Sequence, residues 1–248
     1  MDSAPTDGAP GPRTQVRRPP GARPGVPAPW ETLPEPARRG LTVQTVEVAL
    51  ARAGCAGAPP VSLAADASAG FEAAPSAVLV ALFEEAGEAR TVLTRRSAGL
   101  RAHADEVSFP GGRIDPGESP FEAACREAAE EVSLDPGLVR PAGWLAPLFT
   151  LSSTSLIVPV VVVLDHRPEL HANEAEVSRV FDVALADLVA DNTFAEERWT
   201  VPGRRGEGSE DGSFPVFFFD VATETVWGAT ARILFDLLSV VLGVGPGR

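Results

Sequence analysis

"GRIDPGESPFEAACREAAEEVSL", residues 112–134, holds six carboxylates in twenty-three residues. Its second half predicts a helix. Ser119 can cap the first turn, Pro120 suits the first helical position, and Glu122 completes a capping box with Ser119. We therefore expect a helix from Pro120 onward, with Asp115 and Glu118 on the loop before it.

This helix has two distinct faces. At 100° per residue, one apolar stripe falls within about 100° and faces the core: Phe121, Ala124, Cys125, Ala128 and Val132. Cys125 is therefore interpreted as a packing residue. Glu127, Glu130 and Glu131 share another side at spacings of three and four residues, so their carboxylates are neighbours.

Three neighbouring carboxylates repel one another, which destabilises a helix by a few tenths of a kcal/mol per pair. A bound cation would remove this repulsion, and a ligand set made only of oxygen favours Mg²⁺ or Mn²⁺. The alternative is a solvated acidic face, which the three glutamates alone do not exclude.

The frame around the three glutamates resembles the box of the Nudix hydrolase superfamily. Gly112, Glu118, Arg126-Glu127 and Glu130-Glu131 stand at its spacing, and six of its seven charged or glycine positions match. Two positions depart from it: Ala128 is smaller than the usual aliphatic residue, and Ser133 replaces the final glycine. That glycine ends the helix in a left-handed conformation, which costs other residues roughly 1 kcal/mol.

The resemblance implies an α/β fold, the Nudix-type α/β/α sandwich with a mixed central sheet, and hydrolysis of a nucleoside diphosphate linked to another group. It also implies that Mg²⁺ or Mn²⁺ is bound by Glu127, Glu130, Glu131 and the backbone carbonyl of Gly111. Arg126 would orient Glu118 or Glu130 through an ion pair, so the implied catalytic residues are Glu127, Arg126 and Glu118. The catalytic base stays open, with loop residues Glu174 and Glu176 as candidates or as plain solvated acids.

The preceding segment, "VLTRRSAGLRAHADEVSFPGG" (residues 92–112), resembles a second signature, which marks coenzyme A pyrophosphatases within that superfamily. The matching positions are Leu93, Thr94, Arg96, Ser97, Arg101, Phe109, Pro110, Gly111 and Gly112. Asp105 stands where that signature has glycine and adds negative charge near an anionic substrate. If the position needs a positive φ, aspartate tolerates it better than most residues.

Arginines gather in this segment of an acidic chain, and guanidinium groups suit phosphate. The resemblance implies substrate binding by Arg96, Arg101 and Ser97, whereas Arg90 and Arg95 are interpreted mainly as solvated groups at strand edges. The expected reaction cleaves the pyrophosphate of coenzyme A to 3′,5′-ADP and 4′-phosphopantetheine. The alternatives are the same chemistry on NADH or ADP-ribose, and a Nudix-fold binding protein without turnover.

Composition limits the partners. A net charge of −13 argues against binding to a nucleic-acid backbone. The two cysteines, Cys55 and Cys125, form no metal-ligand spacing and no disulfide framework, which fits a reduced setting. The longest apolar run is too short to span a bilayer, and no apolar core follows the early arginines. We expect a cytoplasmic protein that contacts no membrane; the sequence gives no oligomeric state.

The chain divides into two parts. Residues 1–36 contain ten prolines and four glycines, which predicts a disordered Pro/Gly/Arg-rich tail, and residues 37–248 form the Nudix domain with its box at 112–134. Strands are expected over 76–85, 89–96, 156–165 and 176–185, and a paired set over 197–201 and 214–221. Helices are expected from Ala37 to about 54, over 185–191, and at the C-terminal end, with Thr223 or Thr225 as cap and Gly243 as stop.

Overall fold

The structure, a computed structural model, describes residues 16–59, 75–99, 104–150, 156–200, 211–221 and 224–244. The N-terminal elements are β1 (Arg23–Pro24), a 3₁₀ turn η1 (Pro29–Thr32), α1 (Glu35–Arg38) and α2 (Val43–Arg52). The middle elements are β2 (Ser76–Glu85), β3 (Glu88–Arg96), β4 (Val107–Ser108), β5 (Gly111–Arg113), α4 (Pro120–Val132), η2 (Pro136–Leu138), β6 (Arg140–Trp144), β7 (Leu148–Phe149) and β8 (Leu156–Val163). The C-terminal elements are β9 (Val177–Ala184), α5 (Leu185–Leu188), β10 (Phe194–Trp199), β11 (Phe214–Val221), β12 (Glu224–Trp227) and α6 (Gly228–Leu242).

The main sheet is mixed and centres on β2. This strand pairs antiparallel with β3 and β5 and parallel with β8. β3 also pairs with β4 and β9, while β8 pairs with β6 and β7. Seven of the eight β8 residues are buried, which fits the continuous apolar run that predicted a strand covered on both faces.

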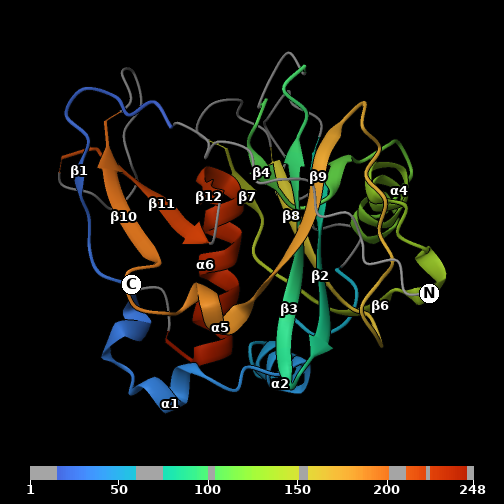
Figure 1. Cartoon of the computed structure of the whole chain (residues 1–248), viewed down its shortest axis with the longest axis horizontal. Coiled ribbons are helices and arrows are strands. Elements are labelled where there is room, and N and C mark those ends of the chain that lie inside the picture. The colour runs from blue at the N-terminus through green and yellow to red at the C-terminus, as the bar shows by residue number, and fades with distance from the viewer. Residues whose placement is uncertain are drawn as a thin grey trace, which may run out of the picture.

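Helices cover both faces of this sheet, and two separate cores result. Alternate residues of β2, such as Ala77 and Leu79, pack with α4 on one face, whereas Val80 and Leu82 belong to the core of the other face. Helices α2 and α6 lie on that second side (Figure 1). The fold is therefore α/β with a mixed central sheet between helical layers, as expected.

A second sheet, in the order β1-β10-β11-β12, lies beside α6 (Figure 1). Its β10 and β11 pair antiparallel over Phe194–Trp199 and Phe214–Phe219, as the sequence predicts. Aromatic rings from this sheet and from α6 pack closely; the centroids of Phe217 and Phe235, for example, lie 4.4 Å apart.

The expectation of disorder across residues 1–36 is wrong for residues 16–36. Arg23 and Pro24 pair with β10, and the Trp30 side chain is 1% exposed among Phe194, Phe219 and Phe235. Residues 1–15 lie outside the described part. A proline-rich segment can still be ordered, because one large aromatic side chain buries enough area to anchor it.

Two helix starts also differ from expectation. The first long helix begins at Val43 with Thr42 as cap, because Gly40 takes a φ of +71° and separates it from α1. The last helix begins at Gly228, since residues 224–227 pair with β11 as strand β12; Thr223 lies outside the described residues. Gly243 ends α6 in the left-handed conformation, as predicted. No helix within the described ranges combines the length and apolar character needed to cross a bilayer.

Candidate active site

Helix α4 begins and ends as its sequence predicts. The Ser119 hydroxyl accepts from the Glu122 N–H, and the Glu122 carboxylate accepts from the Ser119 N–H. The Ser119 hydroxyl also donates to the Glu122 carboxylate at 2.7 Å, and this bond, with the one from the Ser119 N–H, lowers the pKa of Glu122. At the other end Ser133 takes φ 58° and ψ 29°, the left-handed conformation expected of the glycine that it replaces. The apolar stripe, including Cys125, packs on β2, and burial raises the pKa of the Cys125 thiol to about 11.

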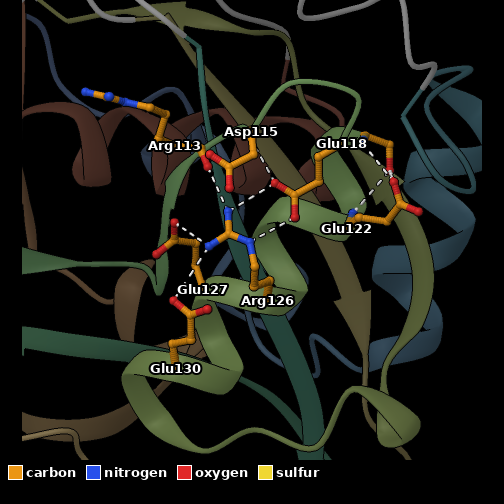
Figure 2. A network of polar contacts seen from close by, with 8 residues as sticks. Arg113, Asp115, Glu118, Glu122, Arg126, Glu127 and Glu130 are labelled. Carbon is orange, nitrogen blue, oxygen red and sulfur yellow. Dashed lines mark hydrogen bonds and ion pairs between the residues drawn. The ribbon is translucent and has the colours of Figure 1, made fainter.

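Arg126 lies at the centre of the acidic loop and helix (Figure 2). Its Nε and Nη2 donate to the two Glu118 oxygens at 2.9 and 3.0 Å, and its Nη1 donates to Glu127 Oε1 at 2.9 Å. Nη2 also donates to the Arg113 carbonyl at 3.0 Å, while Glu130 Oε2 lies 3.6 Å from Nη1. Hydrogen bonds from Arg126 lower the pKa of Glu118, and the carboxylates raise the pKa of Arg126.

The expected ion pair of Arg126 therefore forms with Glu118 in a two-point contact and only distantly with Glu130. The Glu118 carboxylate also accepts from the Asp115 N–H, which closes the loop before α4. Arg126 thus ties together the loop, the helix and β5, and it holds Glu127 beside them. This arrangement suits positioning of Glu127; the catalytic roles of Glu118, Arg126 and Glu127 remain predictions.

Glu131 differs from its two neighbours because it is buried, only 3% exposed. Its Oε2 accepts from the Gly111 N–H at 3.1 Å, and its Oε1 lies 3.5 Å from Arg96 Nη1. Burial raises the Glu131 pKa to about 7, while the Gly111 N–H and Arg96 oppose that rise and the Glu127 and Glu176 charges add to it. A buried carboxylate with so little compensation would be stabilised by a further positive charge.

Two glycines let the strand and the helix approach this closely. A Cβ on Gly112 would lie 2.4 Å from the Glu127 carboxyl carbon, and one on Gly111 would lie 2.3 Å from the Ala77 carbonyl oxygen. Gly111 also has a φ of +154°. A side chain at Gly111 would push β5 away from the β2 backbone, and one at Gly112 would displace the Glu127 carboxylate, so the glycines of the "FPGG" segment have a role beyond a simple turn.

The donor set fits a hard divalent cation. Glu127, Glu130 and Glu131 offer only carboxylate oxygens, which Mg²⁺ and Mn²⁺ prefer, and the buried Glu131 gains most from such a charge. Within the described ranges, no three Asp, Glu, His or Cys side chains converge into a metal-binding group. Glu127 instead contacts the guanidinium of Arg126, and Glu130 is exposed. The four predicted metal ligands, three carboxylates and the Gly111 carbonyl, therefore remain a prediction.

Of the predicted substrate-binding residues, Arg96 and Ser97 are described and Arg101 lies outside the described ranges. Arg96 lies on the α4 face of the sheet, beside Glu131. Ser97 is engaged by the loop before β9: its hydroxyl donates to the Glu174 carbonyl at 2.9 Å, and its N–H donates to the Glu176 carbonyl at 2.9 Å. The loop that carries both candidate bases is thereby fixed next to β3.

Asp105 adopts a φ of 60°, so this aspartate takes a backbone conformation that glycine would adopt more readily. Its Oδ1 lies 3.6 Å from Arg95 Nη2. Arg95, interpreted from the sequence as a solvated strand-edge residue, is buried, and its Nη1 donates to both Glu224 oxygens at 3.2 and 3.1 Å. Sequence reasoning missed Glu224, because it lies 129 residues from Arg95 and no local motif marks it.

Comparison with known proteins agrees with this site. The NUDIX domain family model matches residues 73–202, more than half of the chain. The uncharacterized Nudix hydrolase NudL of Photorhabdus laumondii is 38% identical over 151 residues, 60% of this chain and 76% of that protein. Nudix hydrolase 22, chloroplastic, of Arabidopsis thaliana is 35% identical over 179 residues; the match covers 69% of this chain but only 56% of that relative.

Among solved structures, the MutT/nudix family protein from Enterococcus faecalis aligns with a TM-score of 0.45 and 14% identity, covering 69% of this chain and 63% of that one. The family match spans β2 to β10 and contains the whole acidic stretch. Nudix enzymes typically use a divalent metal ion and bind nucleoside diphosphate derivatives. The chain therefore belongs to the Nudix family and is a Nudix hydrolase, an enzyme that acts on pyrophosphate bonds.

Proposed function

We propose that this enzyme hydrolyses the pyrophosphate bond of coenzyme A or its derivatives, giving 3′,5′-ADP and 4′-phosphopantetheine. The observation that carries the proposal is the contact between the two motifs: Arg96 Nη1 lies 3.5 Å from Glu131 Oε1. A guanidinium suited to phosphate and a carboxylate suited to a metal ion thus lie next to each other on the α4 side of the sheet.

Glu127, Glu130, Glu131 and the Gly111 carbonyl would hold Mg²⁺ or Mn²⁺. When bound, such an ion lowers the pKa of water and neutralises charge on phosphate oxygens. Arg126 holds Glu127 in place through its contact at 2.9 Å and anchors itself on Glu118. Arg96, with Ser97 and Arg101, would bind the phosphates of the substrate.

Asp105 is the main departure from the coenzyme A signature, and its position supports a specific expectation. Its carboxylate lies near Arg95, close to where an anionic substrate would be held. The charge opposes a polyphosphate ligand, so we infer that it weakens coenzyme A binding without altering the chemical step.

The two free cysteines support a reduced, cytoplasmic location.

The test is a substrate panel. Purified protein is incubated with coenzyme A, NADH and ADP-ribose in the presence of Mg²⁺ or Mn²⁺, and the products are identified by mass spectrometry. The proposal expects 3′,5′-ADP and 4′-phosphopantetheine from coenzyme A at the highest kcat/KM. Faster cleavage of NADH or ADP-ribose would replace it with another nucleoside diphosphate substrate, and no turnover with any metal would favour a binding protein.

Two variants of Asp105 sharpen this test. Asp105→Gly and Asp105→Asn both remove the charge, and both residues tolerate a positive φ. Each should lower the KM for coenzyme A several-fold with little change in kcat, the pattern of improved uniform binding. Unchanged coenzyme A kinetics in both variants would mean that this segment does not contact the substrate.

A further inference from the structure

A cluster of charged side chains around the buried Glu224 connects the second sheet to the predicted substrate-binding segment. Glu224 on β12 is 1% exposed and accepts two hydrogen bonds from Arg95 on β3. Arg179 on β9 donates to the same carboxylate at 3.5 Å, and Asp105 lies 3.6 Å from Arg95. Glu224 is thus shared between two arginines, one from each of two neighbouring strands.

Glu224 offsets a repulsion that the sheet itself creates. Arg95 and Arg179 are direct partners across β3 and β9, and like charges directly opposite each other destabilise a strand pair. A buried carboxylate that contacts both arginines removes this cost. Without it, Arg95 and Arg179 would lose the buried carboxylate that they share, and their mutual repulsion would increase.

The pairing of β3 with β9 changes register next to Arg95. The β3–β9 pairing shifts between Arg95 and Arg96, with Ser178 as the extra residue on β9. The Ser178 hydroxyl donates to the Arg95 carbonyl at 3.1 Å and lies 3.4 Å from that of Arg96. Such irregularities re-aim side chains near functional sites. Here Arg95 contacts the second sheet, and Arg96 contacts Glu131 on the opposite face.

We propose that Glu224 is a positioning residue for substrate binding: by holding Arg95, it fixes the strand end that presents Arg96 and Ser97, and the turn at Asp105. The inference rests on the part of the proposed function that assigns substrate binding to Arg96 and Ser97, and it does not depend on which substrate the enzyme cleaves. Because Glu224 is on β12, the proposal gives the second sheet a role in substrate binding. Glu224 also lies outside the residues that the family model matches.

The test compares Glu224→Gln with Glu196→Gln in the full chain. Glu196 is a matched control because it is also a largely buried, ion-paired glutamate of the second sheet. Its ion pair, at 3.4 Å, is with Arg198 of its own strand β10. Glu224→Gln should raise KM about tenfold and leave kcat within about threefold, whereas Glu196→Gln should change neither. Glu224→Asp, which keeps the charge, should restore part of the affinity.

The substrate used is whichever of coenzyme A, NADH and ADP-ribose the wild-type enzyme cleaves, so a wrong substrate assignment leaves this test intact. Amide hydrogen exchange provides a readout that needs no turnover. Exchange should accelerate in residues 95–99 and 104–108 of Glu224→Gln but not of Glu196→Gln. Equal KM and exchange in these two variants, or a lower melting temperature alone, would overturn the proposal and leave Glu224 with a purely structural role.

Discussion

Arg126 and Trp30 each lie at the centre of a cluster, but the two clusters differ in how their partners can be replaced. Around Arg126 the partners are carboxylates and a carbonyl, and its side chain is 31% exposed. Around Trp30 they are three phenylalanine rings, and the indole is 1% exposed. Water can replace a carboxylate as the partner of the guanidinium, and a metal ion can replace the guanidinium as the partner of a carboxylate. No solvent molecule can fill the space of a buried ring.

Because of this difference, the cluster around Trp30 should determine the stability of the fold, and the cluster around Arg126 should affect catalysis. Exposed ion pairs contribute roughly 0–1 kcal/mol each, so the contacts of the partly exposed Arg126 can be rearranged at less cost than the buried rings. The aromatic core beside the second sheet stabilises the fold, and the predicted metal ligands are not part of it. Substitutions in one cluster should therefore change a different measurable property from substitutions in the other.

The largest effect is expected at the aromatic cluster. Trp30→Ala should lower the free energy of unfolding by about 3–5 kcal/mol, because it removes a fully buried ring and leaves a cavity. The measurement is urea denaturation, with kcat recorded at low temperature on folded protein, where it should be unchanged. Val26→Ala, at a position 64% exposed in the same segment, is the control and should have little effect. A loss below about 1 kcal/mol for Trp30→Ala would show that residues 16–36 do not anchor the fold.

The second prediction concerns Glu127, where a substitution should change catalysis but not stability. Glu127→Gln should reduce kcat by more than about 100-fold, because changes to the mere partners of metal ligands already cost 10–100-fold. Its unfolding free energy should stay within about 1 kcal/mol of wild type. Glu122→Gln on the same helix is the matched control, since glutamine also completes a capping box. Full metal-dependent activity in Glu127→Gln would rule out its assignment as a ligand.

The smallest effect tests the end of α4. Ser133→Gly should raise the free energy of unfolding by about 1 kcal/mol, because the left-handed conformation at φ 58° penalises a side chain. Thermal unfolding measures the gain, and kcat should not change. Ser119→Gly at the other end should instead lower stability by a few tenths of a kcal/mol, since it removes the cap. A destabilised Ser133→Gly variant would mean that the serine side chain has a partner of its own.

Local sequence signals were sufficient where the structure is local. The cap at Ser119 was predicted from spacing. The end of the helix at Ser133 and the ion pair of Arg126, with Glu118 or Glu130 as its partner, followed from the resemblance to the Nudix box, and all these residues are close in sequence. The strands β2, β3 and β8 followed from their apolar runs, because burial on both faces leaves a clear pattern.

Long-range contacts left no comparable pattern. Residues 224–227 continue an amphipathic sequence into α6, so their pairing with β11 could not be read from periodicity. The burial of Arg95 depends on Glu224, far along the chain. Trp30 was the one available signal in the proline-rich segment, because a large aromatic residue among small ones is usually buried.

The parallel pairing of β2 with β8 has a consequence for how the chain folds. Ser76 on β2 pairs with Ile157 on β8, so this contact closes a loop that contains α4 and the whole acidic stretch. Contacts between residues so distant in sequence form slowly, because the entropy of loop closure must be offset before they are gained. During synthesis, α4 emerges before β8 exists. Its apolar stripe must therefore wait for the later strand before the core beneath it is complete, and folding of the active-site helix should be limited by this late closure.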